Sequence, residues 1–228
     1  MNALPLPRGL IVSLTPSPQS PWRRTDDVAR LAEAAALGGA VAVKVDGPDA
    51  VRAVRLAVPG LVVLAVSIDD AHGLVRITPT VEHAAELVEA GADVVELEAD
   101  AASRRKEGHD VADIVRQMCA LGTPVKAGVA CVADALTAQE AGAAMVSSST
   151  MGYPARATAG PLPDIGLVAL LCGAVRVPVV AERGYSTPDH VQAAFRAGAH
   201  SVVVGSAIAD PVWLTKQFVA ATPAAHRE

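Results

Sequence analysis

Short runs of apolar, often β-branched residues recur along the chain at intervals of roughly 20 to 35 residues, the spacing of successive strand–helix units. Continuous Val, Ala and Leu character without polar alternation is typical of parallel strands that are covered on both faces. The eight runs are Leu10–Thr15, Ala40–Val45, Leu61–Ser67, Asp93–Ala99, Pro124–Val129, Ala144–Ser149, Pro178–Glu182 and Ser201–Ser206. Each run is therefore predicted to form one strand of a parallel sheet.

Ala- and Leu-rich amphipathic segments separate these runs and are predicted to be helices. They include Asp27–Leu37, Val81–Ala90, Val111–Leu121, Val132–Ala141, Ile165–Gly173 and Pro188–Ala197. Three segments lead into a Gly-Ala pair, at Gly91, Gly142 and Gly198, where the glycine fits the position just after a helix C-terminus. The repeated strand–helix unit predicts an α/β fold, a single (β/α)8 TIM barrel.

A doubly wound parallel sheet is the main alternative for such a pattern. That fold carries a Gly-rich phosphate-binding turn after its first strand, whereas Leu10–Val12 is followed here by Ser13-Leu14-Thr15-Pro16-Ser17-Pro18. The eight near-equal units without such a turn favour the barrel. Because no linker or charge block divides the sequence, residues 1–228 are predicted to form one domain with its core at about 10–220.

The composition narrows the classes of partner. Hydrophobic residues make up 51% of the 228, aromatic residues 3%, and the formal net charge is −5. A nucleic-acid binder needs a basic surface and, for single strands, aromatic platforms, so no nucleic-acid partner is expected. No apolar run approaches the roughly 20 residues that span a bilayer, and the N-terminus lacks the layout of a signal peptide. We expect a cytoplasmic protein with a small-molecule substrate and no membrane partner, and a homodimer is the assembly considered.

The cysteine and histidine positions carry no metal-ligand spacing. Cys119, Cys131 and Cys172 form no CxxC motif, and the six histidines are dispersed along the chain. An odd number of scattered cysteines indicates free thiols that pack as small buried apolar side chains, in a protein of a reducing compartment. We therefore expect neither a metal site nor an organic cofactor.

Charged residues at the ends of apolar strands are the first candidates for chemistry, because the working residues of such barrels lie at the C-terminal ends of the strands. Glu182 ends the run Pro178–Ala181, and Lys44 lies near the end of Ala40–Val45. A charged side chain that points into the barrel there must form an ion pair or take part in binding or catalysis. The alternatives are a solvated loop carboxylate, a surface lysine or a structural ion pair.

Glycines near the last two strand ends suggest an anion site. Gly205-Ser206 follows the eighth run and Gly184 follows the seventh. Exposed amides and a helix N-terminus form the usual phosphate site of TIM barrels at this place. The alternative is that these glycines only end their strands tightly.

In segments that include several of these residues, the chain resembles the N-acetylmannosamine-6-phosphate 2-epimerase family, and the resemblance runs from about residue 10 to residue 220. The matching segments are Leu10-Ile11-Val12-Ser13, Gly38-Gly39-Ala40-Val41, Ile77-Thr78-Pro79-Thr80, Gly152-Tyr153, Pro178-Val179-Val180-Ala181-Glu182, Thr187-Pro188 and Val202-Val203-Val204-Gly205-Ser206-Ala207-Ile208. The resemblance implies a TIM barrel that interconverts N-acetylmannosamine 6-phosphate and N-acetylglucosamine 6-phosphate by removing and returning the C2 proton.

The family's functional residues carry over only in part. The resemblance implies a glutamate on strand seven, which is Glu182, and an arginine on strand two, which is Lys44 here. The family's strand-three lysine, which moves the C2 proton with the glutamate, falls on Ser67. Its strand-five aspartate falls on Gly128, and its arginine after strand eight falls on Asp210.

The order of the residues after strand seven also departs from the family, since Glu-Gly-Arg appears here as Glu182-Arg183-Gly184. The strand ends and the matching segments together give a set of candidate substrate-binding residues. These are Gly184, Gly205, Ser206, Arg183, Ser67, Glu98, Ser148 and Tyr153.

Lys126 is a candidate replacement for the missing lysine base. It lies two residues before Gly128 and so points to the same side of strand five, where the absence of a side chain at 128 leaves room above it. A partly desolvated lysine can have the pKa that proton abstraction needs, whereas serine alone cannot replace it. The alternative is a buried ion pair of Lys126 with Glu96 or Glu98, with no catalytic role.

Three functions remain open at this point. The first is epimerisation by Glu182, Lys44 and Lys126 as relocated catalytic groups. The second is a barrel recruited to another small-molecule reaction, such as Schiff-base chemistry at Lys126, which the acidic Asp210 would favour by repelling phosphate. The third is a non-catalytic ligand-binding homologue, although a scaffold has no need of interior charges that are costly to bury.

Overall fold

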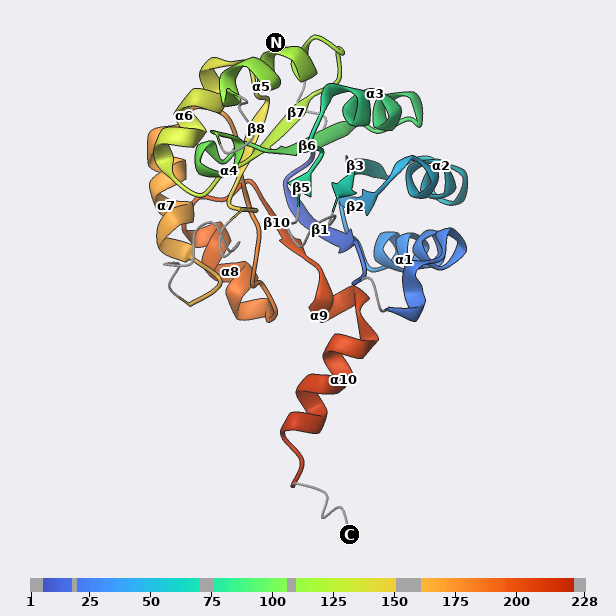
Figure 1. Ribbon diagram of the computed structural model, residues 1–228. Helices are drawn as coiled ribbons and strands as arrows, with labels where there is room; N and C mark the ends of the chain where they lie inside the picture. The colour runs from blue at the N-terminus through green and yellow to red at the C-terminus, as the bar shows by residue number, and fades with distance from the viewer. Residues whose placement is uncertain (1–5, 18–19, 70–75, 106–109, 151–160, 224–228) are drawn as a thin grey trace.

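Eight parallel strands close into a barrel in the computed structural model, which describes residues 6–17, 20–69, 76–105, 110–150 and 161–223 (Figure 1). In order around the barrel they are β1 (Gly9–Leu14), β10 (Ser201–Val204), β9 (Val179–Ala181), β8 (Met145–Ser147), β7 (Val125–Gly128), β6 (Val94–Glu98), β3 (Val62–Val66) and β2 (Ala42–Asp46). Pairing of β1 with both β2 and β10 closes the sheet. The predicted (β/α)8 barrel is therefore confirmed, and each predicted apolar run overlaps one barrel strand, with strand ends that extend at most one residue beyond the run.

Helices surround the barrel as a ring (Figure 1). They are α1 (Thr25–Leu37), α2 (Pro48–Ala57), α3 (Val81–Glu89), α5 (Val111–Cys119), α6 (Val132–Glu140), α7 (Ile165–Ala174) and α8 (Pro188–Arg196). All six predicted helices are present, and their ends agree with the prediction to within two residues. No helix in the described part of the chain is long and apolar enough to cross a membrane.

Several elements were not among the predicted ones. Helix α2 begins with Pro48 directly after Gly47, as proline favours the first helical position. A two-stranded antiparallel hairpin follows β3. The remaining elements are η1 (Pro21–Arg23), β4 (Ile68–Asp69), β5 (Arg76–Ile77), α4 (Ala101–Arg105), α9 (Ser206–Ala209) and α10 (Pro211–Ala220).

The repeated glycine after a helix has the conformation that the sequence predicts. Gly91, Gly142 and Gly198 have φ values of 101°, 105° and 101°, in the left-handed region that glycine enters without a Cβ clash. Each follows a helix and precedes a barrel strand. This shared turn brings the chain from the outer ring of helices back into the sheet.

Apolar side chains fill the lower part of the barrel interior. The buried cluster there consists of Leu6, Ile11, Ala42, Leu64, Val94, Met145, Val180 and Val203. Leu6 precedes β1 and is 1% exposed, so it closes the barrel floor at the N-terminal end of the strands. Residues two positions further along each strand point to the same side and form the next interior layer.

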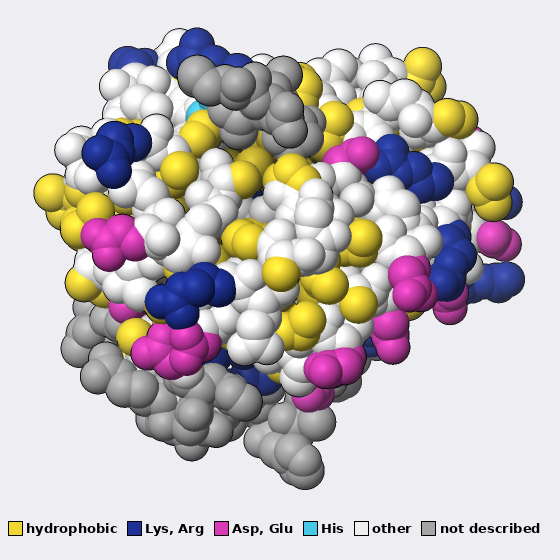
Figure 2. Space-filling view, turned by 90° about the horizontal axis from the view of Figure 1, so that it is seen from above, with side chains coloured by type: hydrophobic (Ala, Val, Ile, Leu, Met, Phe, Trp, Pro, Cys, Tyr) yellow, Lys and Arg dark blue, Asp and Glu magenta, His cyan; other side chains and the backbone are white. Residues whose placement is uncertain are grey.

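Charged side chains of both signs are scattered over the face of the molecule that Figure 2 draws. Among the described residues on the face drawn in Figure 2, Lys and Arg side chains alternate with Asp and Glu, and apolar side chains lie between them. Neither sign of charge dominates this face.

The packing of Leu6 gives a test of the barrel floor. We expect Leu6→Ala to lower the free energy of unfolding by about 2–5 kcal/mol, because a buried leucine is removed from a close-packed cluster. Leu37→Ala is the matched control, since Leu37 is 90% exposed and its loss should change stability by about 0.5 kcal/mol or less. Urea denaturation measures both, and equal effects of the two changes would contradict the assignment of Leu6 to the floor.

Candidate active site

Four charged side chains meet inside the barrel, directly above the apolar layer. Lys44, Glu96 and Glu182 each come two residues after an interior apolar residue, so strand geometry aims them inward. Lys126 of β7 pairs in register with Glu96 of β6 and joins the same layer. The two lysines and two glutamates alternate, and we call these four residues the charged ring.

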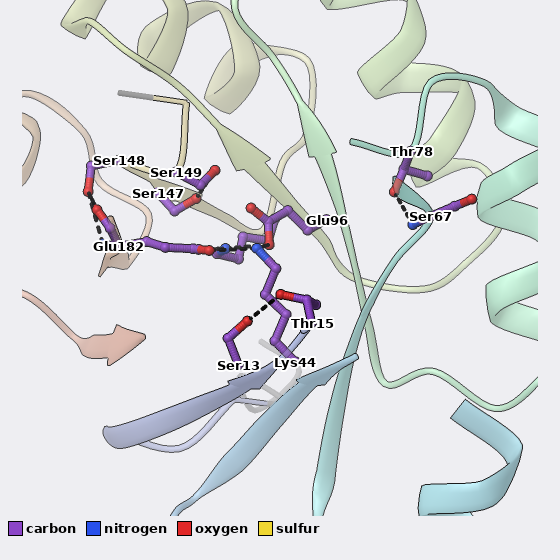
Figure 3. A network of polar contacts seen from close by, with 11 residues as sticks. Ser13, Thr15, Lys44, Ser67, Thr78, Glu96, Ser147, Ser148, Ser149 and Glu182 are labelled. Carbon is purple, nitrogen blue, oxygen red and sulfur yellow. Dashed lines mark hydrogen bonds and ion pairs between the residues drawn. The ribbon is translucent and has the colours of Figure 1, made fainter. Parts of the chain in front are cut away.

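Each lysine of the charged ring contacts both glutamates. Lys44 Nζ lies 2.5 Å from Glu182 Oε1 and 2.7 Å from Glu96 Oε2. Lys126 Nζ lies 2.6 Å from Glu182 Oε2 and 2.7 Å from Glu96 Oε2. The contacts to Glu182 are well-directed hydrogen bonds, whereas those to Glu96 are close ion pairs without that geometry. Figure 3 shows Lys44, Glu96 and Glu182 converging from different strands.

The charged ring holds Glu182 ionised and Lys44 protonated. Burial alone would raise the pKa of Glu182, but the ammonium groups of Lys126 and Lys44 outweigh it and lower the pKa to about 2. Burial would likewise lower the pKa of Lys44, and the carboxylates of Glu182 and Glu96 raise it instead. Opposite charge thus overcomes desolvation at both residues.

A cavity of about 430 Å³ opens above the charged ring, at the C-terminal ends of the strands. This volume lies within the range of small-molecule sites. The hydroxyl-bearing and charged residues that line it are Ser13, Thr15, Lys44, Ser149, Glu182, Arg183, Tyr185, Ser186, Ser206 and Asp210. Hydroxyl groups therefore predominate over charges at the walls, and the charges that line it are two positive and two negative.

The structure places six of the predicted site residues at this cavity. Its lining includes Glu182, Lys44, Arg183, Gly184, Gly205 and Ser206. Four further predicted residues, Ser67, Glu98, Ser148 and Lys126, are outside that lining, and Tyr153 lies outside the described residues.

Lys126 does not reach the cavity by the predicted route. A Cβ built at Gly128 would lie 2.2 Å from Ser149 Oγ and 3.2 Å from the carbonyl oxygen of Leu97, so the space above Lys126 is already filled. The prediction of an open gap at Gly128 is therefore wrong. Lys126 is 0% exposed and contacts Glu96, as the ion-pair alternative predicts, but it also contacts Glu182.

Ser67 belongs to the hairpin that follows β3 and not to the cavity wall. Its N–H donates to Thr78 Oγ1 at 3.1 Å, and the N–H of Thr78 donates to the Ser67 carbonyl at 2.7 Å. Figure 3 shows this pair to one side of the residues that meet in the barrel. The neighbours Val66 and Ile68 line the cavity instead.

Ser148 and Glu98 support the site from behind. The Ser148 hydroxyl accepts from the N–H of Glu182 at 3.0 Å and donates to the Glu182 carbonyl at 2.9 Å, which ties β8 to the end of β9. Glu98 is 3% exposed, and its carbonyl accepts a hydrogen bond from Arg104. Neither residue is part of the cavity lining, and both have backbone or hydroxyl groups that hydrogen-bond at the strand ends.

The residue order after β9 has a steric cause. A Cβ at Gly184 would lie 2.4 Å from Leu162 Cβ and 3.0 Å from the Pro163 nitrogen, so only glycine fits there. Arg183 precedes it with φ 79°, a left-handed conformation that costs a non-glycine residue about 1–2 kcal/mol. The arginine of the family's Glu-Gly-Arg order could not occupy position 184 in this loop.

Asp210 has a structural role that the sequence did not reveal. Its carboxylate accepts hydrogen bonds from the N–H groups of Val212 and Trp213 at 3.0 and 3.2 Å, and so caps the start of α10. The acidic side chain at the cavity rim is thereby directed towards the helix.

Sequence reasoning missed several lining residues. Ser13, Thr15, Ser149 and Ser186 bring hydroxyls to the cavity, and Ser13 Oγ lies 2.9 Å from Thr15 Oγ1. Alternation along the first run would have placed Ser13 and Thr15 on the inner side, two and four residues after Ile11. Within the described ranges no group of three or more His, Cys, Asp or Glu residues is arranged to hold a metal ion.

Comparison with known proteins gives one consistent result. Residues 28–224 match the family described as "Putative N-acetylmannosamine-6-phosphate epimerase". Relatives named "Putative N-acetylmannosamine-6-phosphate 2-epimerase" include one from Klebsiella pneumoniae (strain 342), 38% identical over 88% of this chain and 83% of the relative. Another, from Cutibacterium acnes, is 35% identical over 92% of each chain. The solved structure of the 2-epimerase from Clostridium perfringens superposes with a TM-score of 0.84 at 27% identity, and 93% of each chain is covered.

The lowered pKa of Glu182 predicts a pH dependence of stability. The unfolded carboxyl titrates near 4.5 and the folded one near 2, so stability is fully present above pH 4.5 and is lost as the pH falls towards 2. We expect the loss to reach about 3 kcal/mol, since one pKa unit corresponds to about 1.36 kcal/mol. Urea denaturation at several pH values measures it. Glu182→Gln should lose this slope, and an unchanged slope in that variant would contradict the assignment.

Proposed function

The chain belongs to the N-acetylmannosamine-6-phosphate epimerase family, and we propose that it interconverts N-acetylmannosamine 6-phosphate and N-acetylglucosamine 6-phosphate. The observation that carries the proposal is the contact of Lys44 with Glu182 at the floor of a hydroxyl-lined cavity. A base and an acid at one carbon are what inversion at C2 requires.

In the proposed reaction Glu182 and Lys44 act on opposite faces of C2 of the open-chain sugar. The Glu182 carboxylate takes the C2 proton, and the electrons of that C–H bond pass into an enolate. The Lys44 ammonium then gives a proton to the other face of C2, and the enolate electrons form the new C–H bond. When the product leaves, the proton on Glu182 passes to Lys44 across their short contact, which restores both charges.

The walls of the cavity fit a sugar phosphate in this proposal. Hydroxyl groups of Ser13, Thr15 and Ser149 offer hydrogen bonds to the sugar hydroxyls. Arg183 supplies the positive charge for the phosphate, and the backbone of Gly205 and Ser206 lines the same cavity. Glu182 and Lys44 are the proposed catalytic residues, and the others are proposed to bind the substrate.

The proposal also covers cofactors, location and partners, and the alternative of Schiff-base chemistry. Enolisation by an acid and a base needs neither a metal nor an organic cofactor. We place the reaction in the cytoplasm, with no nucleic-acid or membrane partner. Schiff-base chemistry is disfavoured, because Lys44 and Lys126 are each held by two carboxylates.

A homodimer is also proposed, and the C-terminal helix supports it. Helix α10 follows the last barrel strand, yet it extends away from the ring of helices (Figure 1). Its apolar side chains are exposed, with Leu214 at 40%, Phe218 at 69% and Val219 at 60%. A contiguous apolar face of this kind marks an interface. In the proposed dimer each α10 packs against the second copy of the chain.

The dimer is tested by mass in solution. We expect light scattering of the full chain to give twice the mass of one chain, and Phe218→Asp to halve it, because a charge would be buried at the interface. Leu56→Asp is the control, since Leu56 is 85% exposed on α2 and should leave the mass unchanged. A wild-type chain with the mass of one copy would refute the dimer.

The epimerase is tested by exchange of the C2 proton. We expect the wild type to exchange the C2 proton of either sugar phosphate with D₂O, as NMR detects. Glu182→Gln and Lys44→Met should each lower turnover by roughly 10²–10⁴-fold, the usual share of general acid–base catalysis. The control is Glu33→Gln, because Glu33 is exposed on α1, away from the cavity lining. Wild-type exchange in Glu182→Gln would exclude Glu182 as the base.

A further inference from the structure

The charged ring has two members at the cavity and two that are sealed. Lys44 and Glu182 line the cavity, and their side chains are 6% and 9% exposed. The Lys126 and Glu96 side chains are 0% exposed and do not line it. Of the four contacts in the ring, only the one between Lys44 and Glu182 joins two cavity-facing groups.

We propose that the charged ring opens only at its Lys44–Glu182 contact to admit the reacting carbon, and that Lys126 and Glu96 are positioning residues that hold the separated groups on either side of it. This inference rests on the proposed epimerase function. A carbon atom cannot lie between two groups that are 2.5 Å apart, so the substrate must separate them. Reacting atoms in productive complexes lie about 3–3.5 Å apart.

The remaining contacts of the ring keep both groups in place during this separation. Lys126 holds Oε2 of Glu182 at 2.6 Å, which leaves Oε1 directed towards the cavity. Glu96 holds Lys44 at 2.7 Å and also holds Lys126 at 2.7 Å. Ser148 fixes the backbone of Glu182 on the other side through its N–H and carbonyl. Glu182 therefore has two anchors that do not depend on Lys44.

The opening also changes the acid–base strength of the pair. Burial raises the pKa of Glu182 and lowers that of Lys44, and their mutual contact opposes both effects. When the substrate separates the two groups, each loses part of the opposite charge that counteracts the effect of burial. The pKa of Glu182 then rises and that of Lys44 falls, so both move towards neutral pH. The resting ring is thus inert, and substrate insertion itself produces a usable base and acid.

The charges around Glu182 define what each variant should do. The charged groups that face it are Lys44 from β2, Glu96 from β6 and Lys126 from β7, and Arg183 and Asp210 line the same cavity. Lys126→Met removes one cation and leaves the ring with one excess negative charge. Lys126→Met/Glu96→Gln removes one charge of each sign, so the ring is again neutral but the Oε2 anchor of Glu182 is absent.

The experiment compares these two variants with the wild type in kcat, KM and the pH profile of kcat/KM. Because Lys126 does not touch the substrate, we expect KM to stay within about twofold, while misplacement of the base lowers kcat roughly 10²-fold. In Lys126→Met the acid limb of the profile should move to higher pH by about one unit or more, since Glu182 loses a neighbouring cation. The neutral double variant should recover stability and remain slow.

One control variant separates positioning from stability. Arg55→Met breaks the ion pair between Arg55 and Asp93, which are not among the cavity-lining residues, and should change the melting temperature without moving the pH profile. Recovery of wild-type kcat and pH profile by the double variant would overturn the positioning role and leave the epimerase intact.

A readout without turnover distinguishes failure of the inference from failure of the proposed function. Carboxyl ¹³C NMR of glutamate-labelled protein follows the titration of Glu182 in each folded variant. If the wild type does not exchange the C2 proton, the epimerase proposal fails, and the anchor is judged by this titration alone. A Glu182 titration that is the same in Lys126→Met and in the wild type would overturn the inference.

Discussion

The alternation of two ammonium and two carboxylate groups inside the barrel is the interaction on which the rest of the site depends. Burying ions costs several kcal/mol each, and only close opposite charges offset that cost. Here every charge has two partners, so removal of any one leaves an uncompensated charge that costs about 3–5 kcal/mol. The arrangement leaves the cavity floor polar but electrically neutral, which suits a substrate with many hydroxyl groups.

Two packing constraints shape the cavity around this ring. Ser149 occupies the space that a side chain at Gly128 would need, so the wall above Lys126 is closed and carries a hydroxyl. The loop after β9 approaches Leu162 so closely that position 184 has no room for a Cβ. A charged side chain in this loop is then available at position 183, in a left-handed conformation, and it lines the cavity beside Glu182.

The barrel, and the positions of Glu182 and Lys44 near the C-terminal ends of its strands, could be predicted from the sequence. The alternation of side chains along a strand depends only on neighbouring residues. Apolar runs, Gly-Ala turns and charges at strand ends are all read from a few neighbouring residues. The closed gap at Gly128 could not be predicted, since it depends on Ser149, which follows β8, the strand paired with β7, and lies 21 positions further along the chain. The capping role of Asp210 needed the exact start of α10, and the hairpin at Ser67 needed the pairing of β4 with β5.

The departures from the family's residues form one connected change. Where the family has a lysine, the end of β3 here enters a hairpin, and Val66 and Ile68 make that wall of the cavity apolar. Neither of these two side chains can donate or accept a proton. In the proposed reaction the acid and the base come instead from β2, which is paired with β3, and from the end of β9, where Lys44 and Glu182 lie in contact. A lysine in place of arginine at position 44 suits this change, since an ammonium can give up a proton and a guanidinium cannot.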